Sequence, residues 1–292
     1  MKTLKVLPLI AFFCLFNLHH ALSQTVKDSI QYKVETVDGN EFIGQILSQD
    51  STVVNLKTEK LGTLSIKRKD ITSLKQISAL KSKDGAYWFE NPQATHYLTS
   101  GNGYGLKKGE AYYQNAWILF NHFNVGITNN FSIGAGLFPT FLFASSNVPV
   151  WLTPKVTFPI KENQINIGVG ALLGTVAGVD KSSFGIVYGV STFGSRDKNI
   201  SIGLGYGYLD GDFSKKPMIS VSGLIRTGPR GYIITDNYMF QAGSQTNFIF
   251  SLGGRRLIKR VGLDYGLFVP VYKQMTDFIA IPWLGLIIPL GK

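Results

Sequence analysis

The chain has 292 residues, of which 45% are hydrophobic and 13% aromatic, and its mean hydropathy of +0.11 excludes an intrinsically disordered protein. Its formal net charge is +11, from 29 Lys and Arg against 18 Asp and Glu. After residue 23 no stretch reaches the about 18 consecutive apolar residues that a transmembrane helix needs.

Residues 1–23 are typical of a secretory signal peptide. Lys2 and Lys5 precede a hydrophobic stretch, and Ala21-Leu22-Ser23 supplies small residues at the two cleavage positions. The only cysteine, Cys14, lies inside that stretch, so we expect a mature chain without disulfides, cysteine metal sites or cysteine nucleophiles. Removal of the two lysines lowers the net charge from +11 to +9.

Much of the positive charge lies between the periodic segments described below. The residues concerned are Lys107, Lys108, Lys215, Lys216, Arg255, Arg256, Lys259 and Arg260. This distribution favours solvated loops and contacts with anionic lipid headgroups over a nucleic-acid surface, so no nucleic-acid partner is expected.

Residues 24–77 form a separate unit. Short alternating strands are predicted over 29–37, 41–47, 52–57 and 63–67, with Asp38-Gly39-Asn40 as a tight hairpin turn. The order of strands and turns resembles the small Sm-like or SH3-like barrels. The nucleotide-binding signatures of the Sm family are absent and the charge is near neutral, so we expect a periplasmic adaptor or spacer with a protein partner in the envelope. Residues 78–92 are predicted to be a linker whose Tyr87-Trp88-Phe89 anchors the barrel rim or contacts another domain.

The segment 199–208 carries the strongest pattern in the chain. Ile200, Ile202, Leu204, Tyr206 and Tyr208 alternate with Ser201, Gly203, Gly205 and Gly207. Because successive side chains of a strand point to opposite faces, one face is apolar and the other small or polar. This is typical of a transmembrane β-barrel strand, with its apolar face toward lipid.

Comparable runs fill residues 93–292. Eleven are clear, at about 111–127, 131–142, 149–160, 164–175, 182–193, 199–209, 217–226, 231–241, 246–255, 258–271 and 278–290. Since bacterial barrels have an even number of antiparallel strands, we predict a twelfth over 95–104, which gives about 12 strands with both barrel termini on the periplasmic side. Pro282 and Pro289 weaken the last run, because each removes a ladder hydrogen bond.

The predicted lumen holds few polar groups that could perform chemistry. Asp264 is expected to pair with Arg226 or Lys155, either as a charged constriction or as an ion pair in a filled interior. An outer-membrane lipid A deacylase would need a histidine beside a serine nucleophile, and no matching string surrounds His122. Asp210-Gly211-Asp212 is interpreted as a solvated loop, not a calcium site. The lumen candidates are therefore Asp264, Arg226, Lys155, Gln114, Asn166 and His122, with no catalytic residue, metal site or cofactor assigned.

The stretch from Tyr97 through Gly105-Leu106-Lys107-Lys108-Gly109-Glu110, together with residues 112–115 and 126–134, resembles uncharacterised outer-membrane barrels of Bacteroidota-type bacteria. The resemblance implies an outer-membrane location, with lipid and the barrel-insertion machinery as partners, and no particular activity. The first hypothesis is a non-enzymatic structural barrel or narrow passive pore. The alternatives are an outer-membrane enzyme that modifies lipid and a soluble β-barrel carrier of lipid or another hydrophobic ligand.

Overall fold

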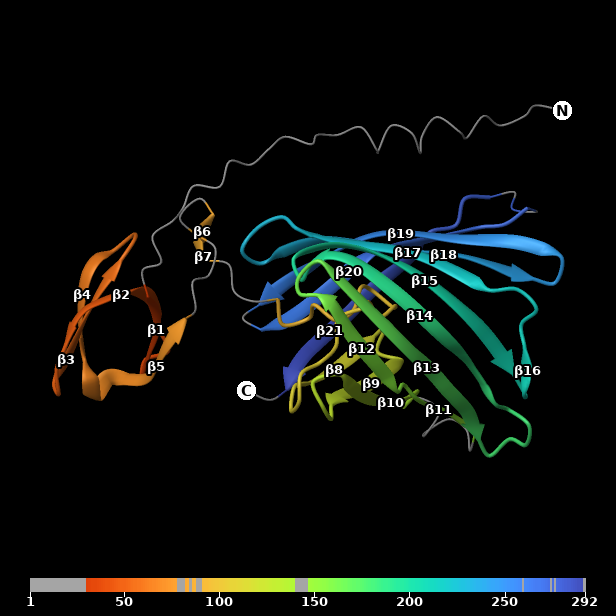
Figure 1. Cartoon of the computed structure of the whole chain (residues 1–292), viewed down its shortest axis with the longest axis horizontal. Coiled ribbons are helices and arrows are strands. Elements are labelled where there is room, and N and C mark those ends of the chain that lie inside the picture. The colour runs from red at the N-terminus through yellow and green to blue at the C-terminus, as the bar shows by residue number, and fades with distance from the viewer. Residues whose placement is uncertain are drawn as a thin grey trace, which may run out of the picture. The chain divides into compact units, whose positions relative to one another are not determined.

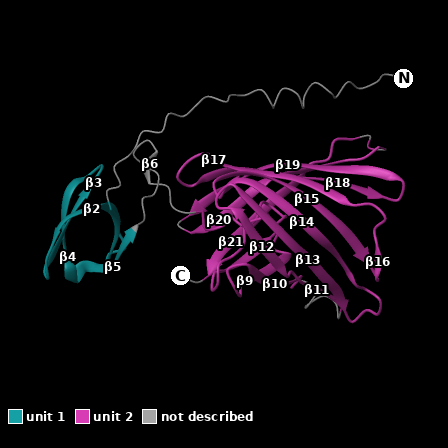
Figure 2. Ribbon diagram, in the orientation of Figure 1, with its two compact units in different colours: residues 1–80 teal, residues 81–292 magenta. Residues whose placement is uncertain are grey.

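The structure, a computed structural model, describes residues 30–77, 82–83, 86–87, 91–139, 147–258, 260–273, 275 and 277–290. It divides into two compact units, Met1–Leu80 and Lys81–Lys292 (Figure 2). The predicted signal peptide and most of the predicted linker, including the aromatic side chains at 87–89, lie outside the described residues. Among the described residues, no helix is both long and apolar enough to cross a membrane.

The first unit is a five-stranded antiparallel sheet. Its strands are β1 (Gln31–Thr36), β2 (Glu41–Gln49), β3 (Val53–Thr58), β4 (Gly62–Lys67) and β5 (Ile71–Ile77), with a 3₁₀ turn at Arg68–Asp70. The order is β4-β3-β2-β1-β5, so the last strand pairs with the first. Val34, Leu56 and Ile66 form the buried core. The predicted turn is present, with Gly39 at a φ of 80°.

The second unit is a closed antiparallel barrel of twelve strand positions (Figure 1). β11 and β12 share one position, because both pair with β10 on one side and β13 on the other, and β9 pairs with β10 to close the ring. A two-stranded ribbon, β6 (Ser82–Lys83) and β7 (Ala86–Tyr87), precedes the barrel. The barrel strands are β8 (Ala111–Ala116), β9 (Phe120–Gly126), β10 (Phe131–Leu137), β11 (Val148–Leu152), β12 (Lys155–Lys161), β13 (Ile165–Ala177), β14 (Phe184–Ser195), β15 (Lys198–Leu209, extended by its partner β16, Asp212–Phe213), β17 (Met218–Arg226), β18 (Gly231–Ala242), β19 (Gln245–Ile258), β20 (Val261–Val271) and β21 (Ile281–Leu290).

The exposed outward-facing side chains are mostly apolar. The lumen-facing ones are small or polar, or they are apolar side chains that pack with Tyr97 and Leu98 inside the barrel. In β15 the residues Ile200, Ile202 and Leu204 are exposed on the outside, whereas Ser201 is buried inside. The prediction for this strand is confirmed. A soluble carrier of a hydrophobic ligand would need the opposite arrangement, with its apolar side chains around the interior. The barrel is therefore of the outer-membrane type, which places the chain in the outer membrane.

The predicted number of strands is correct, but the twelfth strand comes from a different place. The run 111–127 is a hairpin of two strands, β8 and β9, joined at residues 117–119. Trp117 and Ile118 both adopt a positive φ there. Turns of this kind normally carry Gly, Asn or Asp, so the apolar sequence concealed the turn. The segment 95–104 is not a wall strand and lies inside the barrel.

The two prolines of β21 lie where no ladder hydrogen bond is lost. The β20–β21 ladder ends at Gly262 and Ile287, so Pro289 has no partner residue opposite it on that side. The β21–β8 ladder ends at Gly285, before Pro282 is reached. The Pro282 carbonyl accepts a hydrogen bond from the Trp117 indole on the same side, 2.6 Å away. These are the edge positions that proline tolerates in a sheet.

Candidate functional site

The lumen is occupied by part of the chain itself, residues 91–106, called here the lumenal segment. It folds back on itself: the Tyr97 amide donates to the Ser100 carbonyl at 2.8 Å, and the Asn102 amide donates to the Thr95 carbonyl at 3.1 Å. Tyr97, Asn102 and Leu98 are fully buried. The same Tyr97 hydroxyl reaches the wall and contacts polar side chains of β15. The segment is therefore packed as a core inside the barrel.

A buried ion pair holds the backbone of the lumenal segment. The Arg255 Nε lies 2.6 Å from Asp264 Oδ1, and both side chains are 0% exposed. The remaining guanidinium nitrogens donate to the carbonyls of Gln93, at 2.9 Å, and Tyr97, at 2.8 Å. One arginine thus satisfies a carboxylate and two buried carbonyls, which is the condition under which a buried charge pair is tolerated.

A second buried carboxylate, Asp236 on β18, holds the tip of the lumenal segment. Its Oδ2 accepts the backbone amides of Thr99 and Ser100, each at 2.9 Å, and the Thr99 hydroxyl. Its Oδ1 accepts the hydroxyls of Ser100 and Ser222, at 2.7 and 2.6 Å. Five donors compensate for the burial of this charge, as desolvation requires.

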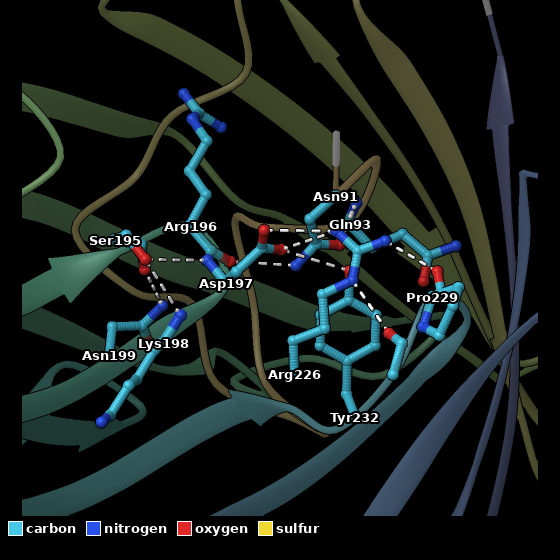
Figure 3. Close-up of polar contacts among 11 residues, drawn as sticks. Asn91, Gln93, Ser195, Arg196, Asp197, Lys198, Asn199, Arg226, Pro229 and Tyr232 are labelled. Carbon is cyan, nitrogen blue, oxygen red and sulfur yellow. Dashed lines mark hydrogen bonds and ion pairs between the residues drawn. The ribbon is translucent and has the colours of Figure 1, made fainter. Parts of the chain in front are cut away.

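A third charged cluster lies where the lumenal segment begins, between the β14–β15 and β17–β18 turns (Figure 3). Arg226 pairs with Asp197 at 3.2 Å and its guanidinium lies over the Tyr232 ring, 5.3 Å from the centroid. Asn91 donates to the Arg196 carbonyl at 3.0 Å. This cluster joins the start of the lumenal segment to two barrel turns. The Asp197 side chain is 40% exposed, whereas that of Arg226 is 1% exposed.

The part of the lumen not filled by the segment is a cavity of about 260 Å³. Polar side chains dominate its wall on β8, β9 and β12, and the opposite wall, on β14, is made by the lumen-facing Ile186, Tyr188 and Val190. The titratable side chains that line it are His96, His122, Lys155, Tyr112, Tyr188 and Tyr238.

Two histidine–hydroxyl pairs line this cavity among the described residues. In one, Thr95 Oγ1 and His96 Nδ1 belong to chain neighbours and lie 3.3 Å apart, and the other is formed by His122 and Thr153, which come from different strands. His122 Nε2 and Thr153 Oγ1 lie 2.9 Å apart. Thr153 sits at the break between β11 and β12, where it exchanges two backbone hydrogen bonds with Gly134. A Cβ at Gly134 would lie 2.5 Å from both His122 Nε2 and Thr153 Oγ1, so only glycine leaves room for the pair. A nucleophilic hydroxyl beside an imidazole is the arrangement that covalent acyl transfer uses.

Aromatic stacking fixes the imidazole from the other side. The Tyr112 ring meets the His122 ring edge-on, with centroids 6.4 Å apart, and stacks on His96 at 4.9 Å. Asn124 donates to the Tyr112 hydroxyl at 3.3 Å. The orientation of His122 is therefore set by packing from the lumenal segment as well as by the wall.

His122 also borders a second pocket, an apolar groove on the outer face of β8 to β13. Its outward wall is made by Tyr113, Asn121, Phe123, Ala135, Leu137, Val150, Leu152, Leu173 and Thr175. The lumen-facing His122, Gly136 and Trp151 complete its floor. One histidine thus lies between a lumenal cavity of mixed polar and apolar lining and an apolar surface on the lipid side.

The residues proposed from sequence are all in the wall, but not in one site. Asp264 pairs with Arg255 and not with Arg226 or Lys155, which corrects the expected partner. Arg226 belongs to the cluster of Figure 3. The Lys155 ammonium donates to the Tyr104 carbonyl at 2.8 Å.

The remaining candidates lie close to the cavity or the segment. Gln114 donates to the Leu98 carbonyl at 3.3 Å, and Asn166 is buried beside the lumenal segment, against Gly103. Only Lys155, Gln114 and His122 line the cavity together.

Arg255, Asp236 and Thr153 were missed by sequence reasoning. Arg255 was expected in a solvated loop, yet it is fully buried in β19. The tight turn between Ile258 and Val261 fixes the register that places Arg255 directly opposite Asp264. Counting back from that turn in the sequence could have predicted this pair. Thr153 offered no comparable signal, because its partner is distant in sequence.

No family model and no curated protein matches the chain. Among solved structures it is similar to one described as "Outer-membrane expressed OmpT of Vibrio cholerae", at 12% sequence identity and a TM-score of 0.33, over 90% of this chain and 96% of that one. No group of three or more His, Cys, Asp or Glu that could hold a metal ion occurs among the described residues.

The hypothesis of a non-enzymatic structural barrel or narrow passive pore is wrong. The lumen that a pore would need is filled by residues 91–106, which are held by Arg255 and Asp236. The space that remains is a cavity with a paired imidazole and hydroxyl in its wall. These features favour the alternative of an enzyme in the membrane.

Proposed function

We propose that the barrel is an outer-membrane enzyme that cleaves or transfers an ester bond of a lipid, with Thr153 as nucleophile and His122 as general base. The observation that carries this proposal is the position of the pair. Its atoms lie 2.9 Å apart, and His122 lines both the apolar outer groove and the lumenal cavity, whose wall beside the pair carries the polar side chains of Gln114, Asn124 and Lys155. A lipid substrate needs both environments, one for its polar head and one for its acyl chain.

The chemistry follows from the two side chains. Thr153 Oγ1 attacks the acyl carbonyl while its proton moves to His122 Nε2, and the same imidazole then protonates the departing alcohol. Water releases the acyl group from the threonine in a second step, or another alcohol accepts it. Lys155 lines the same cavity and supplies a cationic donor for an anionic headgroup or for the developing oxyanion.

Thr153→Val tests the nucleophile, because it removes the hydroxyl and keeps the shape. The matched control is Thr157→Val, four residues further along the chain on β12. Thr157 is buried, and its replacement removes a hydroxyl in the same way. The assay follows release of fatty acid from phospholipid and from lipid A by mass spectrometry, with purified protein in vesicles. We expect activity to be lost in Thr153→Val and His122→Gln and kept in Thr157→Val. Equal activity in Thr153→Val and the parent protein would disprove the assignment.

We further propose that residues 24–77 are an Sm-like or SH3-like module in the periplasm that binds another envelope protein. Its support is the strand order, with β5 returning to pair with β1 around a small apolar core. A cysteine introduced at the exposed Ser65 tests the location. We expect a membrane-impermeant maleimide to label it only after the outer membrane is permeabilised. Labelling in intact cells would contradict the periplasmic location.

A further inference from the structure

The barrel wall is low at the β8–β9 hairpin. β8 has 6 residues and β9 has 7, whereas β13 has 13 and β19 has 14. A transmembrane strand needs about 9–11 residues. At about 3.4 Å per residue and a tilt of about 40°, a strand the length of β9 rises about 18 Å, against an apolar band about 25 Å tall. The turn of this hairpin, residues 117–119, therefore falls inside the hydrocarbon layer.

The composition of this turn fits hydrocarbon and not water. It reads Trp117-Ile118-Leu119, with Phe120 following as the first residue of β9, and Ile118 is 80% exposed. Trp117 and Ile118 have φ angles of 51° and 67°, a conformation that apolar residues rarely adopt. The β15–β16 turn, at the same end of the barrel, is made by Asp210-Gly211-Asp212 instead.

The backbone of the turn is hydrogen-bonded internally. Two outward-facing asparagines, Asn115 and Asn121, lie opposite each other in the β8–β9 ladder. Asn115 Oδ1 accepts the Ile118 amide at 3.2 Å, and Asn121 Nδ2 donates to the carbonyls of Ile118 and Leu119, each at 3.2 Å. The Trp117 amide donates to the Leu284 carbonyl at 3.0 Å. Such satisfaction is needed where no water reaches the backbone.

The lumenal cavity lies directly behind this hairpin. Tyr112 and Gln114 on β8, and His122 and Asn124 on β9, face inward and line it. On the other side, the first residues of β21 rise beyond the end of β8, because the β21–β8 ladder stops at Gly285. The hairpin that forms the short part of the barrel wall therefore also lines the lumenal cavity with its inward-facing side chains.

We propose that the β8–β9 hairpin is a rim within the bilayer over which the acyl chain of a membrane lipid passes sideways into the lumenal cavity. This route rests on the proposed function for the chemistry that follows, but the passage of lipid does not depend on it. The substrate class is an acylated lipid of the bilayer, approaching from within the membrane and not from water.

The depth of the turn is measured with a spin label at Ile118→Cys, since the mature chain is expected to contain no cysteine. Val169→Cys, on the outer face of β13, is the lipid-facing reference, and Ser244→Cys, in the β18–β19 turn, is the water-facing one. We expect the label at Ile118 to collide with oxygen as the Val169 label does and to lose collisions with a nickel chelate. Collision behaviour like that of Ser244 would overturn the proposal.

Passage of lipid is measured with a phospholipid that carries a diazirine on its acyl chain, in vesicles with or without lipopolysaccharide. We expect crosslinks on the lumen-facing Gln114 and His122 as well as on the outward-facing Leu173. Loss of these lumenal crosslinks when lipopolysaccharide is added would identify its acyl chains as the preferred source. Crosslinks confined to outward-facing residues in both vesicles would refute the route. Lumenal crosslinks together with full activity in Thr153→Val would leave the route standing and refute the enzyme assignment.

Discussion

Replacing Asp264 with leucine should strongly destabilise the barrel, because it leaves the Arg255 guanidinium without its counter-charge. Both side chains are 0% exposed and meet through two hydrogen bonds, at 2.6 and 2.9 Å. Removal of one partner from a buried pair costs about 3–5 kcal/mol. Arg255 also donates hydrogen bonds to the carbonyls of Gln93 and Tyr97, so we expect the lumenal segment to be held less firmly as well.

The measurement is a urea titration of protein folded in lipid vesicles, with the folded fraction read from heat-modifiable migration on gels. The matched control is Asp197→Leu, which removes the partner of Arg226. Asp197 is 40% exposed, and the buried Arg226 side chain, 1% exposed, keeps its hydrogen bonds to the carbonyls of Gly228 and Pro229, so the cost should stay near about 1 kcal/mol. Equal destabilisation by the two substitutions would refute the argument that burial decides the magnitude.

Three further outcomes are expected. Gly134→Ala should abolish lipid hydrolysis, because the added Cβ would lie 2.5 Å from both His122 Nε2 and Thr153 Oγ1. Gly189→Ala should leave the activity unchanged, because its Cβ would meet nothing within 4 Å. Equal activities of the two variants would contradict this. Asp236→Asn should expose the tip of the lumenal segment to proteolysis, because a neutral amide cannot accept five donors; an unchanged digestion pattern would argue against it. In the first unit, hydrogen bonds from the Thr52 hydroxyl and amide hold the pKa of Asp50 below its usual value. The ionised Asp50 carboxylate therefore stabilises the fold above its unfolded-state pKa, and this contribution is lost as the pH falls through the folded-state pKa. Asp50→Asn should remove that part of the acid sensitivity, read by hydrogen exchange of residues 30–77, and an unaltered pH profile would contradict the assignment.

The sequence alone determined which face meets lipid in strands with a clear alternation, such as β15, but not in β14, where Ile186, Tyr188 and Val190 face the lumen and Val187 and Phe193 face outward. Alternation over 199–208 is a local property of an extended chain, because successive side chains point to opposite sides whatever surrounds them. The number of strands followed from the same periodicity and from the need to close the ring. The stretch 111–127 still misled, since Trp117-Ile118 forms a turn without the residues that normally signal one.

Only the tertiary structure decided what fills the barrel and which polar groups meet. Residues 95–104 were predicted as a wall strand because the strand number had to be even, yet they lie in the lumen, because the β8–β9 hairpin already completes the ring. His122 meets Thr153 only through the pairing of β9, β10 and β11, which no local pattern encodes. The Arg255–Asp264 pair, the contacts of Asp236 and the candidate site all depend on burial and on pairing between strands that are distant in sequence. These are properties of the closed barrel and not of any single segment.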